Sequence, residues 1–142
     1  NLARDPHNRL KFSVSEKGRE SRTHYRLLHR LRGHTFVAVR LDTGRTHQIR
    51  VHMTHIKYPI LGDQLYGGRL AMPKKLDEET REMLIHFKRQ ALHAFRLSFM
   101  HPVSHEMISF ISPIPNDMEA MIIALSDQRL DYKTINEFNY PE

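Results

Sequence analysis

A chain of 142 residues is long enough for one domain, and folded chains of this size remove roughly 70% of their unfolded surface from water. Its 39% hydrophobic and 27% charged residues are ordinary for a globular protein, and no apolar run approaches the roughly 20 residues that span a bilayer. The polar start of the chain does not match a secretory signal, and the lack of cysteine excludes disulfides and thiolate metal sites. We therefore expect a cytoplasmic protein without a membrane segment.

The net charge of +6 is unevenly distributed along the chain. Residues 1–50 contain 12 Lys and Arg against 4 Asp and Glu, whereas residues 51–142 contain 10 against 12. Eight of the first twelve are arginines that follow Lys17, and the planar fork of arginine suits phosphate groups. Such an excess is typical of a surface that faces a polyanion, although a solvated basic face has the same composition. The distribution favours RNA or DNA as a partner.

The first part of the chain is predicted to contain strands after an irregular start. Residues 1–9 show no hydrophobic periodicity and contain a proline, which predicts a loosely ordered loop or arm. We expect strands at residues 11–14, 23–31 and 36–41, the last two paired as a hairpin around Gly33. Strict alternation in the third strand separates a face with Val37, Val39 and Leu41 from a face with Phe36, Ala38 and Arg40.

The remainder is predicted to alternate between helices and one further hairpin. We expect helices at residues 46–55, 76–89 and after a cap at Asn116, a hairpin with strands at residues 92–100 and 107–111, and a loosely ordered tail at residues 127–142. The buried stripe of the last helix is expected to contain Met118, Met121, Ile122 and Leu125. This mixture predicts one α+β domain with mostly antiparallel strands and flanking helices.

Polar side chains are concentrated at the start of the first expected helix. Gly44 ends the preceding strand and permits an unusual turn, after which Arg45, His47, Gln48 and Arg50 follow within two helical turns. This segment suits an anion or a nucleic-acid base, but an amphipathic helix with a polar outer face has the same spacing. For Arg45 and His47, contact with phosphate or base edges and stacking on a neighbouring strand are both open.

The histidines of the same segment raise the question of a metal site. His47, His52 and His55 are separated by five and three residues, and these offsets do not place all three on one helical face. Neither an HExxH sequence nor a nearby carboxylate ligand accompanies them. We therefore predict no metal site.

Two motifs carry a family resemblance. Residues 41–52 resemble the sequence LxTGRTHQIRVH of the RluA/RluD-type pseudouridine synthases, and residues 59–68 resemble the hPhhGDxxYGG that follows it in that family. Residues 23–26 are similar to the strand before the first motif, and residues 90–103 are similar to the family's RQALHA…HP hairpin. The resemblance extends over residues 9–115, roughly, and implies part of the pseudouridine synthase fold.

The resemblance implies an enzyme that converts chosen uridines of large-subunit ribosomal RNA to pseudouridine without a metal, nucleotide or organic cofactor. In that family the aspartate of an HRLDxxTSG sequence attacks the nucleoside, at the base or at the sugar, and C5 of the detached uracil is then joined to the ribose. The arginine of the QIR sequence pairs with this aspartate, and here that arginine is Arg50. A guanidinium beside a carboxylate favours its ionised form and fixes its direction.

Six further side chains are expected to contact RNA. They are Arg30, Arg32, Arg45, His47, Gln48 and Tyr66. Tyr66 lies within the second matched motif, and a buried tyrosine with a satisfied hydroxyl is the alternative interpretation.

The sequence departs from the family pattern at the nucleophile. His29-Arg30-Leu31 matches the start of HRLD but continues with Arg32, and the family's KxYxA strand, whose tyrosine lines the uracil pocket, is also missing. Asp42 and Asp63 lie in the matched motifs at other positions, where turn or cap roles are expected. We therefore interpret residues 1–142 as the C-terminal portion of a catalytic domain that is inactive alone. A non-catalytic RNA-binding module is the alternative.

Overall fold

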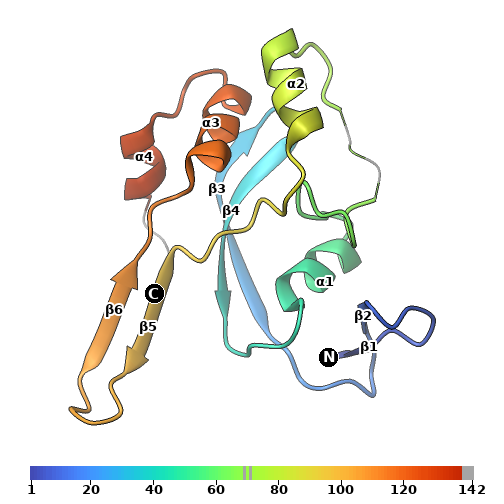
Figure 1. The fold of residues 1–142 in the computed structure, drawn as a ribbon, viewed down its shortest axis with the longest axis vertical. Helices are drawn as coiled ribbons and strands as arrows, with labels where there is room; N and C mark the ends of the chain where they lie inside the picture. The colour runs from blue at the N-terminus through green and yellow to red at the C-terminus, as the bar shows by residue number, and fades with distance from the viewer. Residues whose placement is uncertain (69, 71, 139–142) are drawn as a thin grey trace.

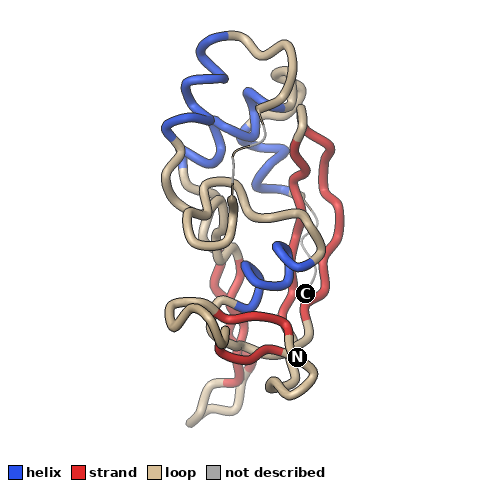
Figure 2. The backbone as a smooth tube through the Cα atoms, turned by 90° about the vertical axis from the view of Figure 1, so that its right-hand side faces the viewer, coloured by secondary structure: helices blue, strands red, loops and turns tan. Residues whose placement is uncertain are grey.

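The chain is elongated, with most of its helices at one end. The computed structural model describes residues 1–68, 70 and 72–138. Helices α2 (Glu78–His86), α3 (Asn116–Leu125) and α4 (Tyr132–Glu137) gather at that end (Figure 1). Helix α1 (Gln48–His55) lies apart from them, beside the N-terminal strands, as Figure 2 also shows from the side. None of the described helices is long and apolar enough to cross a membrane.

The described strands form three two-stranded antiparallel sheets. They are β1 (Leu2–Arg4) with β2 (Phe12–Val14), β3 (Thr23–Leu31) with β4 (His34–Leu41), and β5 (Arg96–Met100) with β6 (Met107–Ile111). Antiparallel hairpins with flanking helices confirm the predicted α+β class. The loop expected at residues 1–9 is wrong in part, because β1 pairs with β2 along its whole length.

The β3–β4 hairpin turns at Gly33, as the sequence predicts. Gly33 has a φ of 60°, and a Cβ at this position would lie 2.7 Å from the ring of Pro73. Both the left-handed backbone and the close approach therefore favour glycine. On β4, Phe36 and Ala38 are 6% and 4% exposed, so this face enters the core and the valine face does not.

The larger apolar core joins β4 to the helical end of the molecule. Phe36 and Ala38 pack with residues of α3 and α4, including Ile135, which is completely buried. A neighbouring cluster places Leu84 of α2 against α3. The four stripe residues predicted for the last helix are all buried: Met118, Met121, Ile122 and Leu125. Burial of this stripe fixes α3 against both α2 and the sheet.

A smaller core holds the other end of the molecule. Leu2 of β1, Val51 of α1 and Tyr66 form this cluster, and Phe12 and Leu65 pack on its edge. Residues that are far apart in sequence thus fix α1 against the N-terminal hairpin. The position of α1 determines where the polar side chains of its first turn lie.

Helix boundaries differ from the sequence prediction for local reasons. Helix α1 begins at Gln48 rather than at residue 46, because His47 has a left-handed backbone with a φ of 56°. Helix α2 is capped by Asp77, whose side chain accepts from the Thr80 N–H, whereas the cap of α3 is Pro115 and not Asn116.

Helix α4 lies in the tail that was expected to be loosely ordered. Loose ordering of residues 1–9 and 127–142 stays a prediction. Residues 139–142 lie outside the described residues.

The β5–β6 hairpin extends away from the helices (Figure 1). The register pairs Leu97 with Phe110 and Phe99 with Ile108, so one face of this hairpin is apolar. Leu97 and Phe110 are nevertheless 60% and 57% exposed. A two-stranded hairpin without a cover is only marginally stable in water.

Candidate active site

Arg50 and Asp63 join the two sequence motifs into one site. Arg50 lies in the first turn of α1, and Asp63 follows in the turn after that helix. Arg50 Nε donates to Asp63 Oδ2 at 2.7 Å and Nη2 donates to Oδ1 at 2.8 Å. The two side chains are 13% and 0% exposed. This is a buried, two-bond ion pair of the geometry that arginine forms with carboxylates.

The turn that presents Asp63 depends on its own sequence. Gly62 has a φ of 72°, and a Cβ there would collide with the carbonyl oxygen of Arg89. Asp63 Oδ1 then accepts from the backbone N–H groups of Leu65 and Tyr66, both at 3.0 Å. These bonds confirm the turn role expected for Asp63. They also fix the direction in which its carboxylate points.

The pair is charged on both sides. Burial alone would raise the pKa of Asp63, but hydrogen bonds from Arg50 and from the Tyr66 N–H outweigh burial and hold this pKa below its ordinary value. The bond with Asp63 in turn raises the pKa of Arg50. At neutral pH the site therefore contains a carboxylate and a guanidinium that neutralise each other.

Tyr66 and His47 complete the surroundings of Arg50. The guanidinium carbon of Arg50 lies 4.8 Å from the centre of the Tyr66 ring, a cation–π distance. The Phe12 N–H donates to Tyr66 Oη at 2.8 Å, and the same oxygen lies 3.0 Å from His47 Nδ1. Tyr66 is 9% exposed, so its hydroxyl is satisfied within the protein.

These contacts bear on the state of His47. The Tyr66 hydroxyl accepts from the Phe12 N–H and shares a hydrogen bond with His47 Nδ1, in which the tautomer of the ring decides the donor. Burial lowers the pKa of His47, and the charge of Arg50 lowers it further. His47 is therefore an uncharged group beside Arg50 at neutral pH.

Gln48 has a structural position. It is 2% exposed, and its Oε1 accepts from the Thr43 hydroxyl and from the Arg45 N–H. Its Nε2 donates to the Arg22 carbonyl and to the Thr23 hydroxyl. All four hydrogen-bonding positions of the amide are thus used inside the chain. Gln48 links the start of α1 to the start of β3, and its amide has no hydrogen-bonding position left for RNA.

The other predicted RNA contacts are spread over the molecule. Arg45 is exposed beside the site, where its Nε donates to the Glu20 carbonyl at 3.2 Å. Arg30 is exposed on β3 opposite Thr35. Arg32 lies at the helical end, where it forms an ion pair with Asp127 and donates to the Lys75 carbonyl. The structure brings His47, Arg50 and Tyr66 together, directs Arg45 to the Glu20 carbonyl, and places Arg30 and Arg32 elsewhere.

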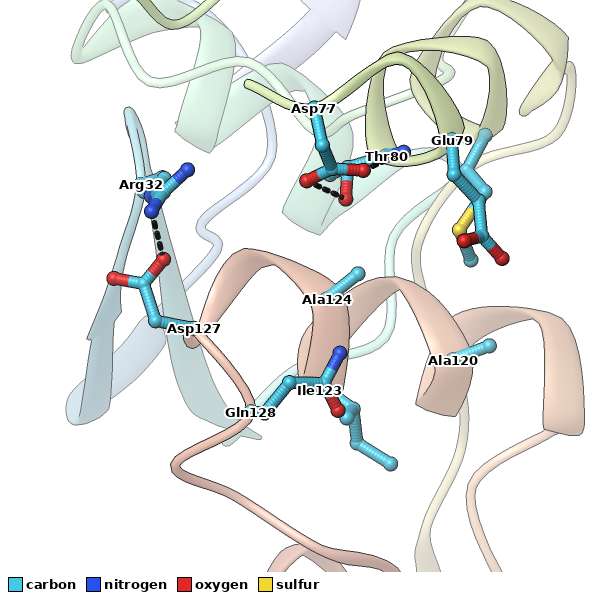
Figure 3. Close-up of a pocket in the computed structure, with 10 residues that line it drawn as sticks. Arg32, Asp77, Glu79, Thr80, Ala120, Ile123, Ala124, Asp127 and Gln128 are labelled. Carbon is cyan, nitrogen blue, oxygen red and sulfur yellow. Dashed lines mark hydrogen bonds and ion pairs between the residues drawn. The ribbon is translucent and has the colours of Figure 1, made fainter. Parts of the chain in front are cut away.

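One groove on the described part of the chain does not include Arg50. It has a volume of about 690 Å³ and lies between α2 and α3, with the Arg32–Asp127 pair on one side (Figure 3). On the other side, Asp77 accepts from the Thr80 hydroxyl (Figure 3). Arg32, Asp77, Thr80 and Asp127 are thus already engaged in pairs, which makes this groove a poorer candidate for chemistry than the surroundings of Arg50.

Sequence reasoning missed the partner of Arg50 within this chain. Asp63 was assigned to a turn, and no helical or strand spacing relates it to a residue 13 positions earlier across that turn. Its presence in the second matched motif was the available signal. Among the described residues, no group of three His, Cys, Asp or Glu side chains is arranged to hold a metal ion.

Comparison with known proteins finds similarity to pseudouridine synthases. A family model described as RNA pseudouridylate synthase matches residues 4–55. The chain is 50% identical over 126 residues to ribosomal large subunit pseudouridine synthase D of Xylella fastidiosa, and 52% identical over 126 residues to the protein of that name in Xanthomonas campestris. These alignments include 89% of this chain.

The relatives are much longer than this chain. The alignments with the Xylella and Xanthomonas proteins cover 38% of each. The synthase D of Haemophilus influenzae is 44% identical over 139 residues, which is 98% of this chain and 42% of that protein. The chain therefore spans about two fifths of the length of the curated relatives that it matches.

Proposed function

We propose that the chain belongs to the RluA/RluD-type pseudouridine synthases and that it supplies the arginine-bearing half of an active site that converts uridine to pseudouridine in large-subunit ribosomal RNA. The relatives are named for this reaction and this RNA. We further propose that residues 1–142 are the C-terminal portion of a catalytic domain, and that the parent enzyme acts in the cytoplasm, where ribosomal RNA would be its partner.

The reaction explains why the site needs a supported carboxylate. The N1–C1′ bond of uridine breaks, a C5–C1′ bond forms, and the proton lost from C5 is balanced by one gained at N1. No atom is added or removed, so the overall reaction is an isomerisation. The proposed nucleophile is an aspartate from outside this chain, which must stay ionised in a pocket that a flipped base closes.

Arg50 is the residue that supports this proposal best. Only the Nε and Nη2 atoms of its guanidinium are engaged by Asp63, and no described residue accepts a hydrogen bond from Nη1. A buried guanidinium with an unused edge is suited to a second carboxylate. Two opposite charges about 4 Å apart attract by about 4 kcal/mol at an effective dielectric constant near 20. Such an attraction is enough to keep the nucleophile ionised.

The neighbouring groups fit contact with RNA. Arg45 is exposed in the turn before α1, and His47 bonds to Tyr66 through Nδ1, so that no hydrogen bond within the described residues uses its Nε2. We propose that these two side chains contact the nucleotide near the site and that Arg30 and Arg32 contact phosphates farther away. Tyr66 acts mainly as the support for the Arg50 guanidinium.

The test compares the full-length parent enzyme with residues 1–142 on deproteinised ribosomal RNA, with pseudouridine read by chemical mapping. We expect modification by the full-length enzyme and none by the shorter chain. Binding of RNA without modification by the full-length enzyme would instead support a non-catalytic RNA-binding module. Modification by residues 1–142 alone would show that no further aspartate is needed.

Replacing Arg50 by Lys in the full-length enzyme tests the role of the fork. Lysine keeps the charge but cannot bond two carboxylates along two edges, so we expect kcat to fall by about 100-fold or more while RNA affinity changes little. Single-turnover kinetics and a binding titration measure the two quantities separately. Equal losses in kcat and in affinity would mean that Arg50 is only a phosphate contact.

A further inference from the structure

We propose that Asp63 is a positioning residue for catalysis, which orients Arg50 so that the Nη1 edge of its guanidinium faces the nucleophilic aspartate. This inference rests on the proposed function. It assigns to Asp63 a task beyond the turn that its sequence context predicts. The motif at residues 59–68 then contributes to the chemistry through Arg50, which belongs to the motif at residues 41–52.

The two oxygens of Asp63 differ in what they bond. Oδ1 accepts from the backbone N–H groups of Leu65 and Tyr66, which are sufficient for the turn, and also from Arg50 Nη2. Oδ2 has no part in the turn and accepts from Arg50 Nε at 2.7 Å. A residue needed only for the turn would not require this second oxygen. The ionised carboxylate, rather than any turn-forming side chain, is therefore used by Arg50.

Asp63 and Tyr66 together remove the freedom of the Arg50 head group. The two bonds from Nε and Nη2 fix its rotation within its plane, and the Tyr66 ring, 4.8 Å from the guanidinium carbon, fixes the position of that plane. Both supports are buried, with Asp63 at 0% side-chain exposure and Tyr66 at 9% exposure. Arginine loses much side-chain entropy when it is ordered, and here folding has already ordered it.

The geometry of guanidinium leaves one usable edge. Of its five N–H groups, the Nε–H and one Nη2–H point to Asp63, and the outer Nη2–H lies on the edge that also carries Nη1. No described residue accepts from Nη1. A second carboxylate can thus bond to the Nη1–Nη2 edge while Asp63 keeps the Nε–Nη2 edge. Arg50 would then bond to two carboxylates at once, namely Asp63, which orients it, and the nucleophilic aspartate, which it orients.

Asp63→Asn separates the two tasks of the residue. The amide oxygen of asparagine can still accept the two backbone N–H bonds of the turn, but its NH2 group cannot accept from Arg50 Nε. A matched control is Asp117→Asn. Asp117 forms a similar two-bond fork with Arg89, at 2.8 and 2.6 Å, and one of its oxygens also accepts from a backbone N–H. That pair lies outside the Arg50 site and is about half exposed.

The first measurement does not involve activity. We follow the Nε–H resonance of Arg50 by proton–nitrogen NMR in residues 1–142. In the unchanged chain we expect a resolved signal that exchanges slowly with water, with loss or fast exchange in Asp63→Asn and retention in Asp117→Asn. A slowly exchanging signal that persists in Asp63→Asn overturns the inference, whatever the enzyme does.

The second measurement is kinetic and uses the full-length enzyme. We expect Asp63→Asn to lower kcat by about 100-fold with a change in KM below about threefold, and Asp117→Asn to leave both unchanged. In an Arg50→Lys background, Asp63→Asn is expected to cost less than about threefold more, because Asp63 acts through Arg50. If Asp63→Asn lowered kcat by the same factor in the unchanged enzyme and in the Arg50→Lys variant, Asp63 would have a merely structural role and the inference would be overturned. This comparison holds even if Asp63→Asn alone folds poorly.

The outcomes distinguish this inference from the proposed function. If Arg50→Lys lowers kcat but Asp63→Asn does not, the inference is wrong and the proposed function stands. If neither Arg50→Lys nor Asp63→Asn changes kcat, the proposed role of Arg50 is wrong, and the inference with it.

Discussion

The carboxylate of Asp63 makes the stability of the chain depend on pH in a defined way. Its pKa in the folded state is held below the value of about 3.9 expected for an unfolded aspartate. A carboxyl with a lowered folded pKa contributes stability at pH values above its unfolded pKa, and this contribution is lost as pH falls through its folded pKa. The contribution of Asp63 is therefore complete at neutral pH and disappears in acid.

The corresponding prediction compares the unchanged chain with Asp63→Asn. At pH 7 we expect the free energy of unfolding of the variant to be lower by about 3 kcal/mol, because the substitution leaves the buried Arg50 guanidinium without its counter-charge. Urea denaturation between pH 7 and pH 2 should show a constant difference above about pH 5 and a shrinking one below about pH 4. Asp42, Asp77, Asp117 and Asp131, whose pKa values are also lowered, are present in both proteins and cancel. A difference that does not change with pH would contradict the assignment of the charge to Asp63.

Two glycines of the matched motifs should differ in how much an added methyl group destabilises the chain. At Gly62 a Cβ would collide with the Arg89 carbonyl oxygen and the φ is 72°, whereas at Gly44 no atom lies within 4 Å of the added Cβ. We expect Gly62→Ala to lower the unfolding free energy by at least about 2 kcal/mol and Gly44→Ala to change it by less than about 0.5 kcal/mol. Thermal and urea denaturation of both variants measure this. Similar losses would mean that the turn at Gly62 can relax.

Single residues were predictable from sequence only where a local rule applies. The turn role of Asp63 follows from its neighbours in the chain, and the satisfied hydroxyl of Tyr66 follows from the cost of burying a polar group. The pairing of Asp63 with Arg50 and the burial of Gln48 could not be predicted, because each depends on how α1 packs against a distant strand or turn. The type of a polar residue does not show whether its side chain faces the interior or the solvent.

At the scale of elements, the β5–β6 hairpin should be the least stable part of the sheet structure. Its strands are exposed along nearly their whole length, whereas β4 buries Phe36 and Ala38 and α3 buries a full stripe. Local stability follows the buried apolar contacts of an element. We expect backbone amides of β5 and β6 to exchange with solvent at rates close to those of an unfolded chain.

Native-state hydrogen exchange checks this prediction, with the amides of α3 and of the β3–β4 pair as internal references. These references should exchange only through opening of the whole domain. Equal protection in β5 and β6 would mean that the hairpin is covered in solution, for example by a second copy of the chain, and dilution would then remove the protection.

The predictable elements are those with a clear period. Alternation identified β4, and the apolar stripe identified α3, because in each case one face is buried. Helix α4 has six residues and owes its position mainly to Ile135 in the core, so its own sequence has too few turns to show a stripe. Strand β1 has three residues and exists through pairing with β2. Short elements of this kind are defined by their partners.

For the whole molecule, the uneven distribution of charge leads to a prediction about salt. Affinity for single-stranded RNA falls with the logarithm of salt concentration by a slope of about 0.7 per neutralised phosphate. We expect the double variant Arg26→Gln, Arg30→Gln, in the exposed part of β3, to reduce this slope by about 1.4. Filter binding or anisotropy between 50 and 200 mM salt, roughly, measures it.

Arg89→Gln provides the control for this salt experiment. Arg89 is paired with Asp117 and belongs to residues 51–142, where acidic and basic side chains nearly balance. Its replacement should leave the slope unchanged. If the control lowers the slope as much as the double variant does, the RNA does not distinguish the basic first third from the rest of the chain.

The short distance along the chain between Arg50 and Asp63 bears on the order of folding. Their pair spans 13 residues and the His47–Tyr66 contact spans 19, so both close small loops at a low cost in chain entropy. We expect contacts of this kind to form before long-range pairings such as that of Phe12 with Tyr66 across 54 residues, because they close smaller loops. During synthesis the guanidinium can therefore acquire its counter-ion while still in water, and hydrophobic closure then buries a neutral pair rather than a lone cation.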